Sequence, residues 1–530
     1  MQGLMWWLQG SLFMARSNLM LAVDCGTQSL RTMIFDPSGS LLDMEKLEYN
    51  PYYSSRPGWA EQDAELYWNS LVQGCQALAQ RSPRLFSRLA GVGVTAQRDS
   101  MVNLASDGHV LRPAIIWLDT RKAKGSYHPG PLMRRVYRSI GKDAMVKKTM
   151  RDGKCNWIRE NQRDVWEKTW KYVQVSGFLN FRLCGECADS VASMVGHVPM
   201  DSRHRKWASP QSLKGRLFPI EKEKLSPLVE PGTVIGKITK EAAQKTGLRQ
   251  GLPVIACGSD KSCESLGMGC LDPSVAALSF GTTATVGVTT LRYFEPLPFL
   301  PAYCAAVPGR WVPEVEIYRG YWMLRWFRDE FGQQETDEAQ RLGVLPEELL
   351  DRLLQDDPPG CRGLMMQPYW GPCLKDPLAK GSFIGFGDVH TRGSVYRATV
   401  EGLGHALRDG LETLEQRGHF RSQAVAVAGG ASRSDLICQI TADIFNRPLY
   451  RGKTHEASGL GAAIITAVAL GVCSTLPHAV ESMTGVGREF LPQKQNAAVY
   501  EQLHDVYRRI YPRMKHLYRE IQQITGYPEV

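Results

Sequence analysis

The chain has 530 residues, 43% of them hydrophobic, which is too long for one ordinary core, so we expect two domains of roughly 250 residues each. Lys and Arg number 63 against 54 Asp and Glu, a net charge of +9, but the basic residues are scattered and form no tract. This argues against a nucleic-acid partner. Thirteen cysteines, an odd number spread along the chain, favour free thiols in a reducing cytoplasm over a disulfide framework.

The apolar start, residues 1–17, is expected to be an extension ahead of the first domain. It is too short to span a bilayer, and no basic segment precedes it as in a signal peptide. No later segment resembles a transmembrane helix, so we expect no membrane partner. Cys184 and Cys187 form a single CxxC without further ligands at matching spacing, which favours a chance pair in a turn over a zinc site.

The first half alternates strands and helices. Apolar runs at 19–23 and 31–35 flank the turn "DCGTQS", and a third strand follows the turn "DPSGS". Apolar residues recur at helical spacing over 64–81, which predicts an amphipathic helix, and 89–96 returns to a strand pattern. The first half is therefore of the α/β class.

The second half repeats this theme. We expect strands at 252–257, at 275–288 around a Gly-Thr turn and at 424–430, and helices at 434–446, 456–471 and about 497–525. Each half thus carries one strand, Gly-Thr turn, strand unit, at 24–29 and at 280–285. This duplication suggests two related lobes facing each other across a cleft.

The turn "DCGTQSLR" suits phosphate, because a Gly turn between strands directs several backbone N–H groups to one place. Thr27 and Ser29 add hydroxyl donors, Arg31 adds a cation, and Asp24 could hold Mg2+ through water. An ordinary polar hairpin explains the same residues.

A second turn, "FGTTAT", offers Thr282 and Thr283, and the two turns together could clamp a polyphosphate. In "AVAGGASRSD", Gly429 and Gly430 let the backbone approach a flat ligand, although a tight strand-to-helix turn needs them equally. No GxxxxGK[ST] motif occurs, which disfavours a P-loop fold.

Gln97, Arg98 and Asp99 come just after a strand, and Trp117 follows in "AIIWLDTR". An aromatic face beside charged hydrogen-bonding groups suits a polyhydroxylated ligand. A surface salt-bridge cluster with a partly buried Trp is the alternative.

Asp260 stands between an apolar run and a helical pattern in "VIACGSDKSCESLGMG". An Asp at this position is often an N-cap, which stabilises a helix by about 1 kcal/mol. A catalytic base is the other interpretation, and the two phosphate-type turns together with the polyol-type pocket favour it.

From about Leu19 to about Gly471 the chain resembles the FGGY family of carbohydrate kinases. The resemblance rests on motifs in the expected order: "AVDCGTQSLR", "RPGWAEQDAELYW", "AQRDS", "RPAIIWLDTR", "GSDKSCESLG", "SFGTTA", "GSFIGFGDVHTRGSVYRATVEG", "AVAGGASRSD" and "EASGLGAA". It implies an actin/hexokinase-like fold with two ribonuclease-H-like lobes and a central cleft. The sugar-binding lobe would span 18–258 and the nucleotide-binding lobe 259–530.

The resemblance also implies roles for individual residues. Asp260 would be the catalytic base and Asp24 would hold Mg2+ in the phosphate loop. ATP would be bound by Thr27, Gln28, Ser29, Arg31, Gly281, Thr282, Thr283, Gly429, Gly430, Ala431 and Ser434, and the acceptor by Gln97, Arg98, Asp99, Trp117 and Lys261. The expected activity is ATP-dependent phosphorylation of a primary hydroxyl of a ketose or alditol. We expect a cytoplasmic enzyme, and the sequence leaves open whether it forms a homodimer.

The chain departs from the family pattern at Arg151 and Cys155 in the first signature and at Phe386 and Ser394 in the second. Glycerol kinases carry a Tyr near the position of Thr149 and a Gln where Lys261 stands. Lys261 offers a strongly hydrated charge with three donors, so we expect an acceptor with more oxygens than glycerol. The alternatives are glycerol kinase-like activity, a catalytically silent sugar-binding regulator, and an ATP-driven chaperone or filament protein.

Overall fold

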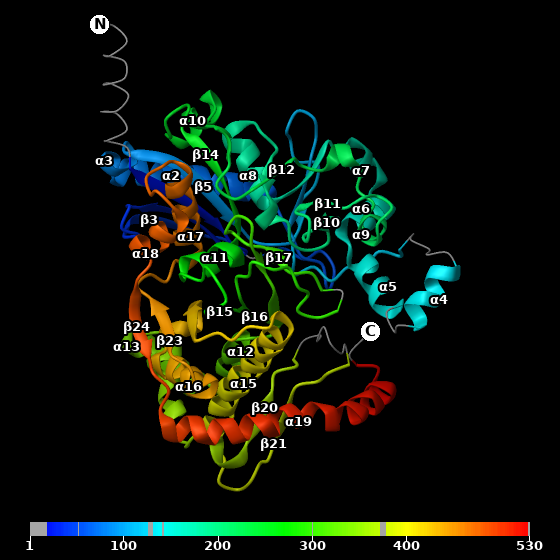
Figure 1. Cartoon of the computed structure of the whole chain (residues 1–530), viewed down its shortest axis with the longest axis vertical. Coiled ribbons are helices and arrows are strands. Elements are labelled where there is room, and N and C mark those ends of the chain that lie inside the picture. The colour runs from blue at the N-terminus through cyan, green and yellow to red at the C-terminus, as the bar shows by residue number, and fades with distance from the viewer. Residues whose placement is uncertain are drawn as a thin grey trace, which may run out of the picture. The chain divides into compact units, whose positions relative to one another are not determined.

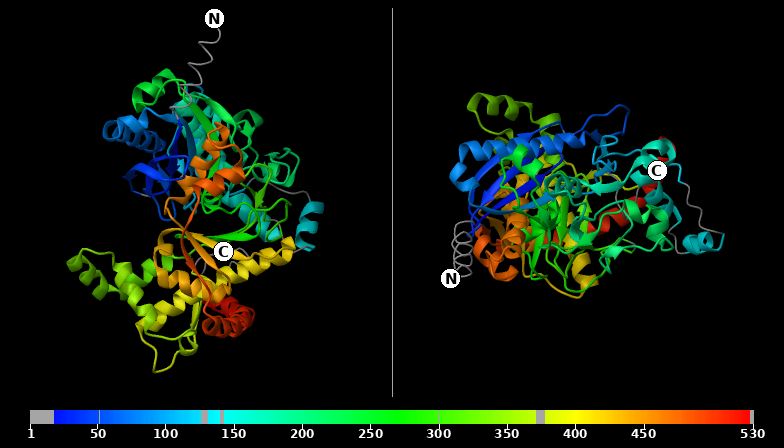
Figure 2. Two further views of the ribbon diagram at one scale, coloured as in Figure 1. Left: turned by 60° about the vertical axis from the view of Figure 1, so that its left-hand side comes forward. Right: turned by 90° about the horizontal axis from the view of Figure 1, so that it is seen from above.

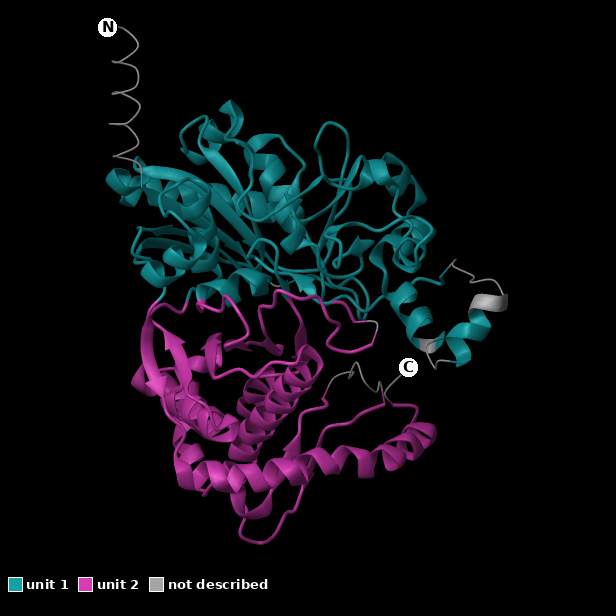
Figure 3. Cartoon of the chain, viewed as in Figure 1, with its two compact units in different colours: residues 1–267, 302–311, 456–484 teal, residues 268–301, 312–455, 485–530 magenta. Residues whose placement is uncertain are grey.

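The computed structural model describes residues 18–50, 52–125, 131–139, 143–298, 300–370 and 378–527, so the expected extension at 1–17 lies outside the described residues. The chain forms two compact units (Figure 3): unit 1 comprises 1–267, 302–311 and 456–484, and unit 2 comprises 268–301, 312–455 and 485–530. The division at 258/259 into a sugar lobe and a nucleotide lobe stays a prediction. The units divide the chain differently because two helices, at 260–267 and 457–469, pack against each other within unit 1.

Unit 1 is built on a six-stranded sheet in the order β13-β14-β5-β1-β2-β3. These strands are β1 (Leu19–Cys25), β2 (Ser29–Phe35), β3 (Leu41–Glu48), β5 (Leu89–Ala96), β13 (Val234–Lys237) and β14 (Pro253–Ser259). Strands β1, β2 and β3 form an antiparallel meander, β5 and β14 run parallel to β1, and β13 is antiparallel to β14. The three parallel strands therefore end at the same edge.

Unit 2 is built on a second six-stranded sheet, in the order β19-β16-β15-β22-β23-β24. Its strands are β15 (Val275–Phe280), β16 (Ala284–Gly287), β19 (Glu314–Ile317), β22 (Ala424–Ala428), β23 (Leu449–Gly452) and β24 (Val486–Phe490). Their directions repeat those of unit 1: a three-stranded meander, then two parallel strands, then an antiparallel edge. This repetition confirms the predicted pair of ribonuclease-H-like units.

The remaining elements surround these two sheets (Figure 1). The helices of unit 1 are α2 (Ala64–Arg81), α3 (Pro83–Phe86), α4 (Pro131–Ser139), α5 (Asp143–Asp152), α6 (Lys154–Asn161), α7 (Arg163–Lys168), α8 (Val175–Cys184), α9 (Leu213–Leu217), α10 (Lys240–Thr246), α11 (Asp260–Gly267), α17 (Ala457–Ala469) and α18 (Leu476–Met483). Those of unit 2 are α12 (Trp322–Phe331), α13 (Gln333–Leu342), α14 (Pro346–Leu350), α15 (Arg392–Gly418), α16 (Asp435–Phe445) and α19 (Lys494–Thr525). Within the described ranges, every helix is too short or too polar to cross a lipid bilayer.

Shorter strands form additional small sheets. One has the order β4-β7-β6-β8, and the others are the pairs β9–β12, β10–β11, β17–β18 and β20–β21. Their bounds are β4 (Glu61–Gln62), β6 (Met101–Leu104), β7 (Ala114–Ile115), β8 (Lys171–Gln174), β9 (Asp189–Ser190), β10 (Met200–Asp201), β11 (Lys206–Trp207), β12 (Leu228–Val229), β17 (Tyr303–Cys304), β18 (Trp311–Val312), β20 (Met365–Gln367) and β21 (Ser382–Ile384).

The two faces of the unit 1 sheet are covered by different helices (Figure 2). Side chains alternate along a strand, so Leu21 and Val23 share a face, and they belong to the same core as residues of α2. The opposite face carries Gly91 and Gly93 of β5. A Cβ on Gly93 would lie 2.3 Å from Thr466 Oγ1 of α17. Glycine in this strand therefore lets α17 approach the sheet closely.

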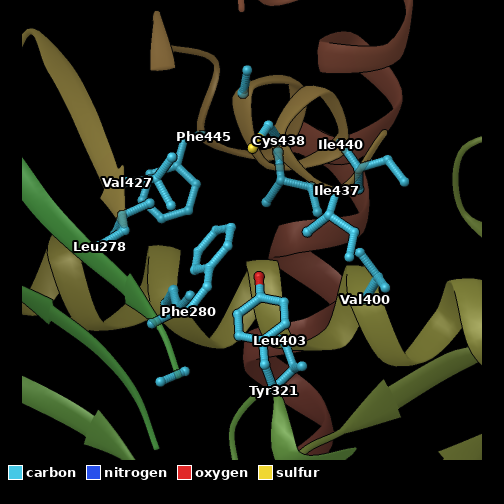
Figure 4. Close-up of a cluster of buried hydrophobic side chains, with 14 of the residues drawn as sticks. Leu278, Phe280, Tyr321, Val400, Leu403, Val427, Ile437, Cys438, Ile440 and Phe445 are labelled. Atoms are coloured by element: carbon cyan, nitrogen blue, oxygen red, sulfur yellow. The ribbon is translucent and has the colours of Figure 1, made fainter. Parts of the chain in front are cut away.

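Unit 2 places its main core between its sheet and the helices α15 and α16 (Figure 4). Leu278 and Phe280 of β15 pack there with Val427 of β22, against Leu403 of α15 and Ile437 of α16. All five side chains are buried. This packing fixes the ends of β15 and β22, from which the Gly-Thr turn and the Gly-Gly turn emerge.

Candidate active site

The register of unit 1 brings the expected catalytic residues to one edge of the sheet. Cys25 pairs with Ala96 across β1 and β5, and Ala96 pairs with Ser259 across β5 and β14. Asp24, the segment beginning at Gln97 and Asp260 therefore lie at the carboxyl ends of three parallel strands. Ligands of open α/β sheets commonly bind at this edge.

The loop between β1 and β2 is held by side chains beneath it. The Tyr49 hydroxyl donates to Gly26 O at 2.6 Å, and Gln62 Nε2 donates to Thr27 O at 2.8 Å. Gln28 at the tip is exposed, whereas Ser29 is buried. The expected phosphate loop is therefore fixed from below and open at its tip.

The Thr27 hydroxyl joins the two predicted groups of ligands. It donates to Gln97 Oε1 at 3.0 Å and accepts from Trp117 Nε1 at 2.9 Å. Gln97 is buried, while Trp117 is 36% exposed and so keeps part of its ring accessible. Thr27 was expected to bind phosphate, but its hydroxyl is occupied by two residues expected on the acceptor side.

Asp99 organises a cluster that we call the Asp99 cluster: Asp99, Lys154 and His197. Asp99 Oδ2 lies 2.6 Å from Lys154 Nζ and 2.9 Å from His197 Nδ1, and Oδ1 accepts the His197 backbone N–H at 3.0 Å. Burial opposes the charge of Asp99, but Lys154 and His197 hold its pKa well below the usual range. Gly196 makes the approach possible, because a Cβ there would lie 2.3 Å from Asp99 Cγ.

Asp24 and Arg31 face α17 rather than Thr27. Arg31 Nη1 lies 3.2 Å from Asp24 Oδ2, and Arg31 Nε lies 3.3 Å from Glu456 Oε2, just before α17. Burial raises the pKa of Asp24 to about 7 against the effect of Arg31, and Asp260, Glu456 and Glu264 raise it further. A buried carboxylate among other carboxylates is a place where a hard cation would be stabilising.

Asp260 is the first residue of α11 and directly follows β14. Its Oδ1 accepts the Lys261 backbone N–H at 2.8 Å, while the Ser262 N–H donates to Ser259 Oγ at 3.4 Å. Ser259 thus takes the N-cap position, and one oxygen of Asp260 also serves the helix start. Burial raises the pKa of Asp260, with Lys261 and Arg98 acting in the opposite direction. A raised pKa suits a general base that must accept a proton near neutral pH.

Two cations lie beside this base. Lys261 Nζ is 2.9 Å from Glu264 Oε2, one turn further along α11. Arg98 stacks over Tyr303 at 5.6 Å from the ring centre and is close enough to Asp260 and Lys261 to influence the pKa of both. The structure therefore brings together Arg98 of one motif and the adjacent Asp260 and Lys261 of another.

Unit 2 carries the other expected nucleotide ligands at the equivalent edge of its own sheet. Residues 281–283 connect β15 to β16, and Ser279 pairs with Ala428, so this loop lies beside Gly429 and Gly430. Thr282 and Gly430 are exposed, and Thr283 Oγ1 donates to Tyr318 O at 3.2 Å.

The two glycines of this turn differ in what they require. Gly429 has a φ of +98°, and a Cβ on it would lie 2.7 Å from the Phe280 backbone, so only glycine fits. A Cβ on Gly430 would meet no atom within 4 Å. The open space at Gly430 is where a ligand could approach the backbone.

Two further predicted nucleotide ligands have structural partners. Ser434 Oγ caps α16 by accepting the Ile437 N–H at 3.2 Å, and it also bonds to Asp351, whose pKa burial raises to about 6. Ala431 packs against the core of unit 2. For both residues the backbone, rather than the side chain, is the part left for a ligand.

Four residues of this edge could not be selected from the sequence: Lys154, His197, Glu264 and Glu456. Lys154 lies between Arg151 and Cys155 of the first family signature, and Glu456 begins "EASGLGAA", but their partners Asp99 and Arg31 are far away in sequence. Glu264 could have been found from its i,i+3 spacing to Lys261 on a helix. Among the described residues, no group of three or more His, Cys, Asp or Glu is arranged to hold a metal directly.

Comparisons with known proteins identify the family of the chain. The model of the N-terminal domain of the FGGY family of carbohydrate kinases matches residues 19–267, and that of the C-terminal domain matches 276–470. The chain therefore belongs to the FGGY family of carbohydrate kinases and is a sugar or polyol kinase.

Individual relatives resemble it over nearly their full length. An uncharacterised sugar kinase of Escherichia coli K12 is 29% identical over 91% of each chain, and a xylulose kinase of Staphylococcus epidermidis ATCC 12228 is 26% identical over 96% of this chain and 99% of the relative. Among solved structures, ligand-bound xylulose kinase from Lactobacillus acidophilus superposes with a TM-score of 0.80 at 22% identity, covering 95% of this chain and 100% of that one. This similarity supports the actin/hexokinase-like fold.

Proposed function

We propose that this kinase transfers the γ-phosphoryl group of ATP to a primary hydroxyl of a ketose or alditol with more oxygens than glycerol. The observation that supports this most is the position of Asp260. It lies at the end of three parallel strands, beside Arg98 and Lys261, and electrostatically close to Asp24. A base, two cations and a second carboxylate are thus concentrated at one edge.

The acceptor would lie against the exposed part of Trp117. Gln97 holds Thr27 and so fixes Trp117. Arg98, Lys261 and the Asp99 cluster would supply further donors and acceptors to the ligand. Several charged groups that are already paired can exchange hydrogen bonds with hydroxyls without moving far, which favours a polyhydroxylated ligand over an apolar one. The charge of Lys261 favours an oxygen-rich acceptor.

The nucleotide would be bound by the turns of unit 2, with its phosphates on Gly281, Thr282 and Thr283 and its base beside the backbone of Gly429–Ala431. Exposed N–H groups and hydroxyls at a Gly turn suit phosphate oxygens. In unit 1, Asp24 would hold Mg2+, which neutralises phosphate charge when bound, and its carboxylate surroundings suit a cation. Arg31, paired with Asp24, would assist in orienting the phosphates.

In the proposed step, Asp260 accepts the proton of the acceptor hydroxyl while the hydroxyl oxygen of the acceptor attacks the γ-phosphorus. The new O–P bond forms as the bond from the γ-phosphorus to the β,γ-bridging oxygen breaks, and ADP leaves with that oxygen. Phosphoryl transfer asks mainly for alignment and charge neutralisation, so most of the side chains position and only Asp260 takes a proton.

The test is ADP formation measured with ATP and Mg2+ against a panel of acceptors: glycerol, tetritols, pentitols, D-xylulose and other ketoses, and D-gluconate. We expect ADP formation to require an oxygen-rich acceptor. Equal activity with glycerol would favour the glycerol kinase alternative. ADP formation without any acceptor would indicate a chaperone-like ATPase, and no ADP with any acceptor would indicate a silent sugar binder.

A further inference from the structure

Lys261 and Glu264 form a shielded ion pair next to the proposed base. Lys261 Nζ lies 2.9 Å from Glu264 Oε2, and the two side chains are 24% and 10% exposed. They lie three residues apart on α11, so their side chains emerge on neighbouring turns of one face. Asp260 is four residues before Glu264, on this same face of the helix.

Stability alone is a weak explanation for such a pair. Taking two charges out of water costs free energy that their attraction repays only in part, and well-packed apolar residues often serve a core better. On a helix whose other inward residues include Cys263 and Leu266, an apolar pair would have sufficed. A buried carboxylate that holds a partly buried ammonium is better explained by a task that needs a fixed charge.

The surroundings of Lys261 indicate that task. Burial disfavours its charge, but Glu264 and Asp260 raise its pKa, against the opposing charge of Arg98. A lysine ammonium has three N–H donors, and Glu264 occupies one of them directly. Lysine side chains are otherwise flexible, so fixing this one in advance removes an entropic cost from ligand binding.

We propose that Glu264 is a positioning residue that holds the Lys261 ammonium beside Asp260, where Lys261 binds an oxygen of the acceptor that glycerol lacks. This inference rests on the proposed function. Glu264 itself touches neither the acceptor nor the transferred group. It acts through Lys261, and the pair selects oxygen-rich acceptors.

The test uses the full chain and measures KM and kcat separately for the acceptor and for ATP, with D-xylulose, D-gluconate, a pentitol and glycerol as probes. Glu264→Gln should raise KM for the preferred acceptor by about tenfold, the loss expected for one charged hydrogen bond, with KM for ATP unchanged. The ratio of kcat/KM between that acceptor and glycerol should fall by a similar factor.

A double-mutant cycle with Lys261→Met separates positioning from a merely structural role. If Glu264 acts through Lys261, Glu264→Gln should add no further rise in KM once Lys261 is replaced. The control is Glu241→Gln, which breaks an exposed Glu–Lys pair of 2.8 Å on α10 and should leave every constant unchanged. If Glu264→Gln does not fold, Glu264→Asp keeps the charge on a shorter stem and should still raise KM for the acceptor.

Three results would overturn the inference: an unchanged KM for the acceptor in both Glu264 variants, a rise in KM for ATP instead, or a full additional effect in the Lys261→Met background. The parent protein distinguishes this failure from that of the proposed function. If wild-type chain shows no acceptor-dependent ADP formation, the proposed function fails first. If it is active and the variants match it, only the role of Glu264 fails.

Discussion

The two units have the same sheet order but different chemistry at the same edge. In unit 1 the strand ends carry buried, paired charges, with Asp24 on Arg31 and Asp99 on Lys154. In unit 2 the equivalent ends carry glycines and hydroxyls, with Thr282 and Gly430 exposed. The same sheet order thus carries fixed charges in unit 1 and accessible backbone in unit 2. This difference fits the proposal that unit 1 binds the acceptor and unit 2 binds the nucleotide.

The largest effect should come from the base of unit 1. Asp260→Asn keeps the size and the helix-start acceptor but cannot take a proton, so turnover should fall by about 10²–10⁴-fold, as for loss of a general base. Rates come from coupled ADP assays and folding from circular dichroism. Asp63→Asn is the control, because Asp63 is the N-cap of α2 and Asn caps a helix as well as Asp. Near-normal turnover in Asp260→Asn would show that Asp260 is not the general base.

Asp24→Asn should reduce activity by roughly a hundredfold, since a carboxylate that neutralises phosphate charge through Mg2+ would be lost. The variant should also stabilise the protein without ligand at pH 8. Folded Asp24 has a pKa of about 7 against an ordinary 3.8, so its contribution to stability is present at acid pH and disappears as pH rises through 7.

We therefore expect the free energy of unfolding of Asp24→Asn to exceed that of the parent by on the order of 1–3 kcal/mol at pH 8 and by little near pH 4. Denaturant titrations at both pH values measure this. A variant less stable than the parent at pH 8 would mean that the pairing with Arg31, not the burial, dominates at Asp24.

In unit 2, two neighbouring glycines should give different results. Gly430→Ala finds space for its Cβ, so it should fold normally and raise KM for ATP by roughly tenfold if a nucleotide occupies that space. Gly429→Ala forces an unfavourable φ and a clash with Phe280, so it should lower the free energy of unfolding by about 2 kcal/mol or more. If Gly430→Ala leaves KM for ATP unchanged, the nucleotide is bound elsewhere.

Lys154→Met should loosen the Asp99 cluster without touching unit 2. Within the cluster Asp99 would keep only its hydrogen bonds to His197, so its position would be less well fixed. We expect KM for the acceptor to rise by about fivefold, with KM for ATP unchanged, as for one weakened charged hydrogen bond. Equal changes in both constants would show that the two units do not divide the ligands in this way.

The smallest expected effect is a shift in pH dependence. Arg98 lowers the pKa of Asp260, so Arg98→Met should raise that pKa, and the acidic limb of the kcat/KM profile should move to higher pH by a fraction of a unit up to about one unit. Activity of the parent itself should fall as pH drops through the raised pKa of Asp260. If the acidic limb of the profile does not move, it reports the titration of a group other than Asp260.

Local patterns predicted most of the elements. The helix expected at 64–81 is α2 (Ala64–Arg81), and the helix expected at 434–446 is α16 (Asp435–Phe445), because apolar spacing and Ser or Asp caps act within a few residues. The strand pairing and the packing of α17 onto β5 could not be predicted in the same way. The strand pairing joins segments far apart in the chain, and the packing of α17 depends on Gly91 and Gly93 meeting side chains from a distant segment.

The site shows the same limit. Motifs brought Arg98, Lys261 and Asp260 into one hypothesis, and the register of β1, β5 and β14 explains why they meet. The Thr27 hydroxyl bond to Trp117 and the pairing of His197 with Asp99 escaped prediction, because each joins segments whose spacing in sequence carries no signal. The roles of these residues in binding stay predictions until they are tested.

The close crossing of α11 and α17 has a consequence for how the protein is made. A Cβ on Gly461 would lie 1.9 Å from Cys263 O, and one on Gly267 would lie 2.0 Å from Ala457 O, so the two helices contact each other backbone to backbone. On the ribosome, the strands of the unit 1 sheet emerge long before α17, and until it arrives they lack the helix that packs against β1, β5 and β14. We therefore expect unit 1 to complete its fold only after α17 has emerged, and a fragment that stops at Gly267 to be prone to aggregation.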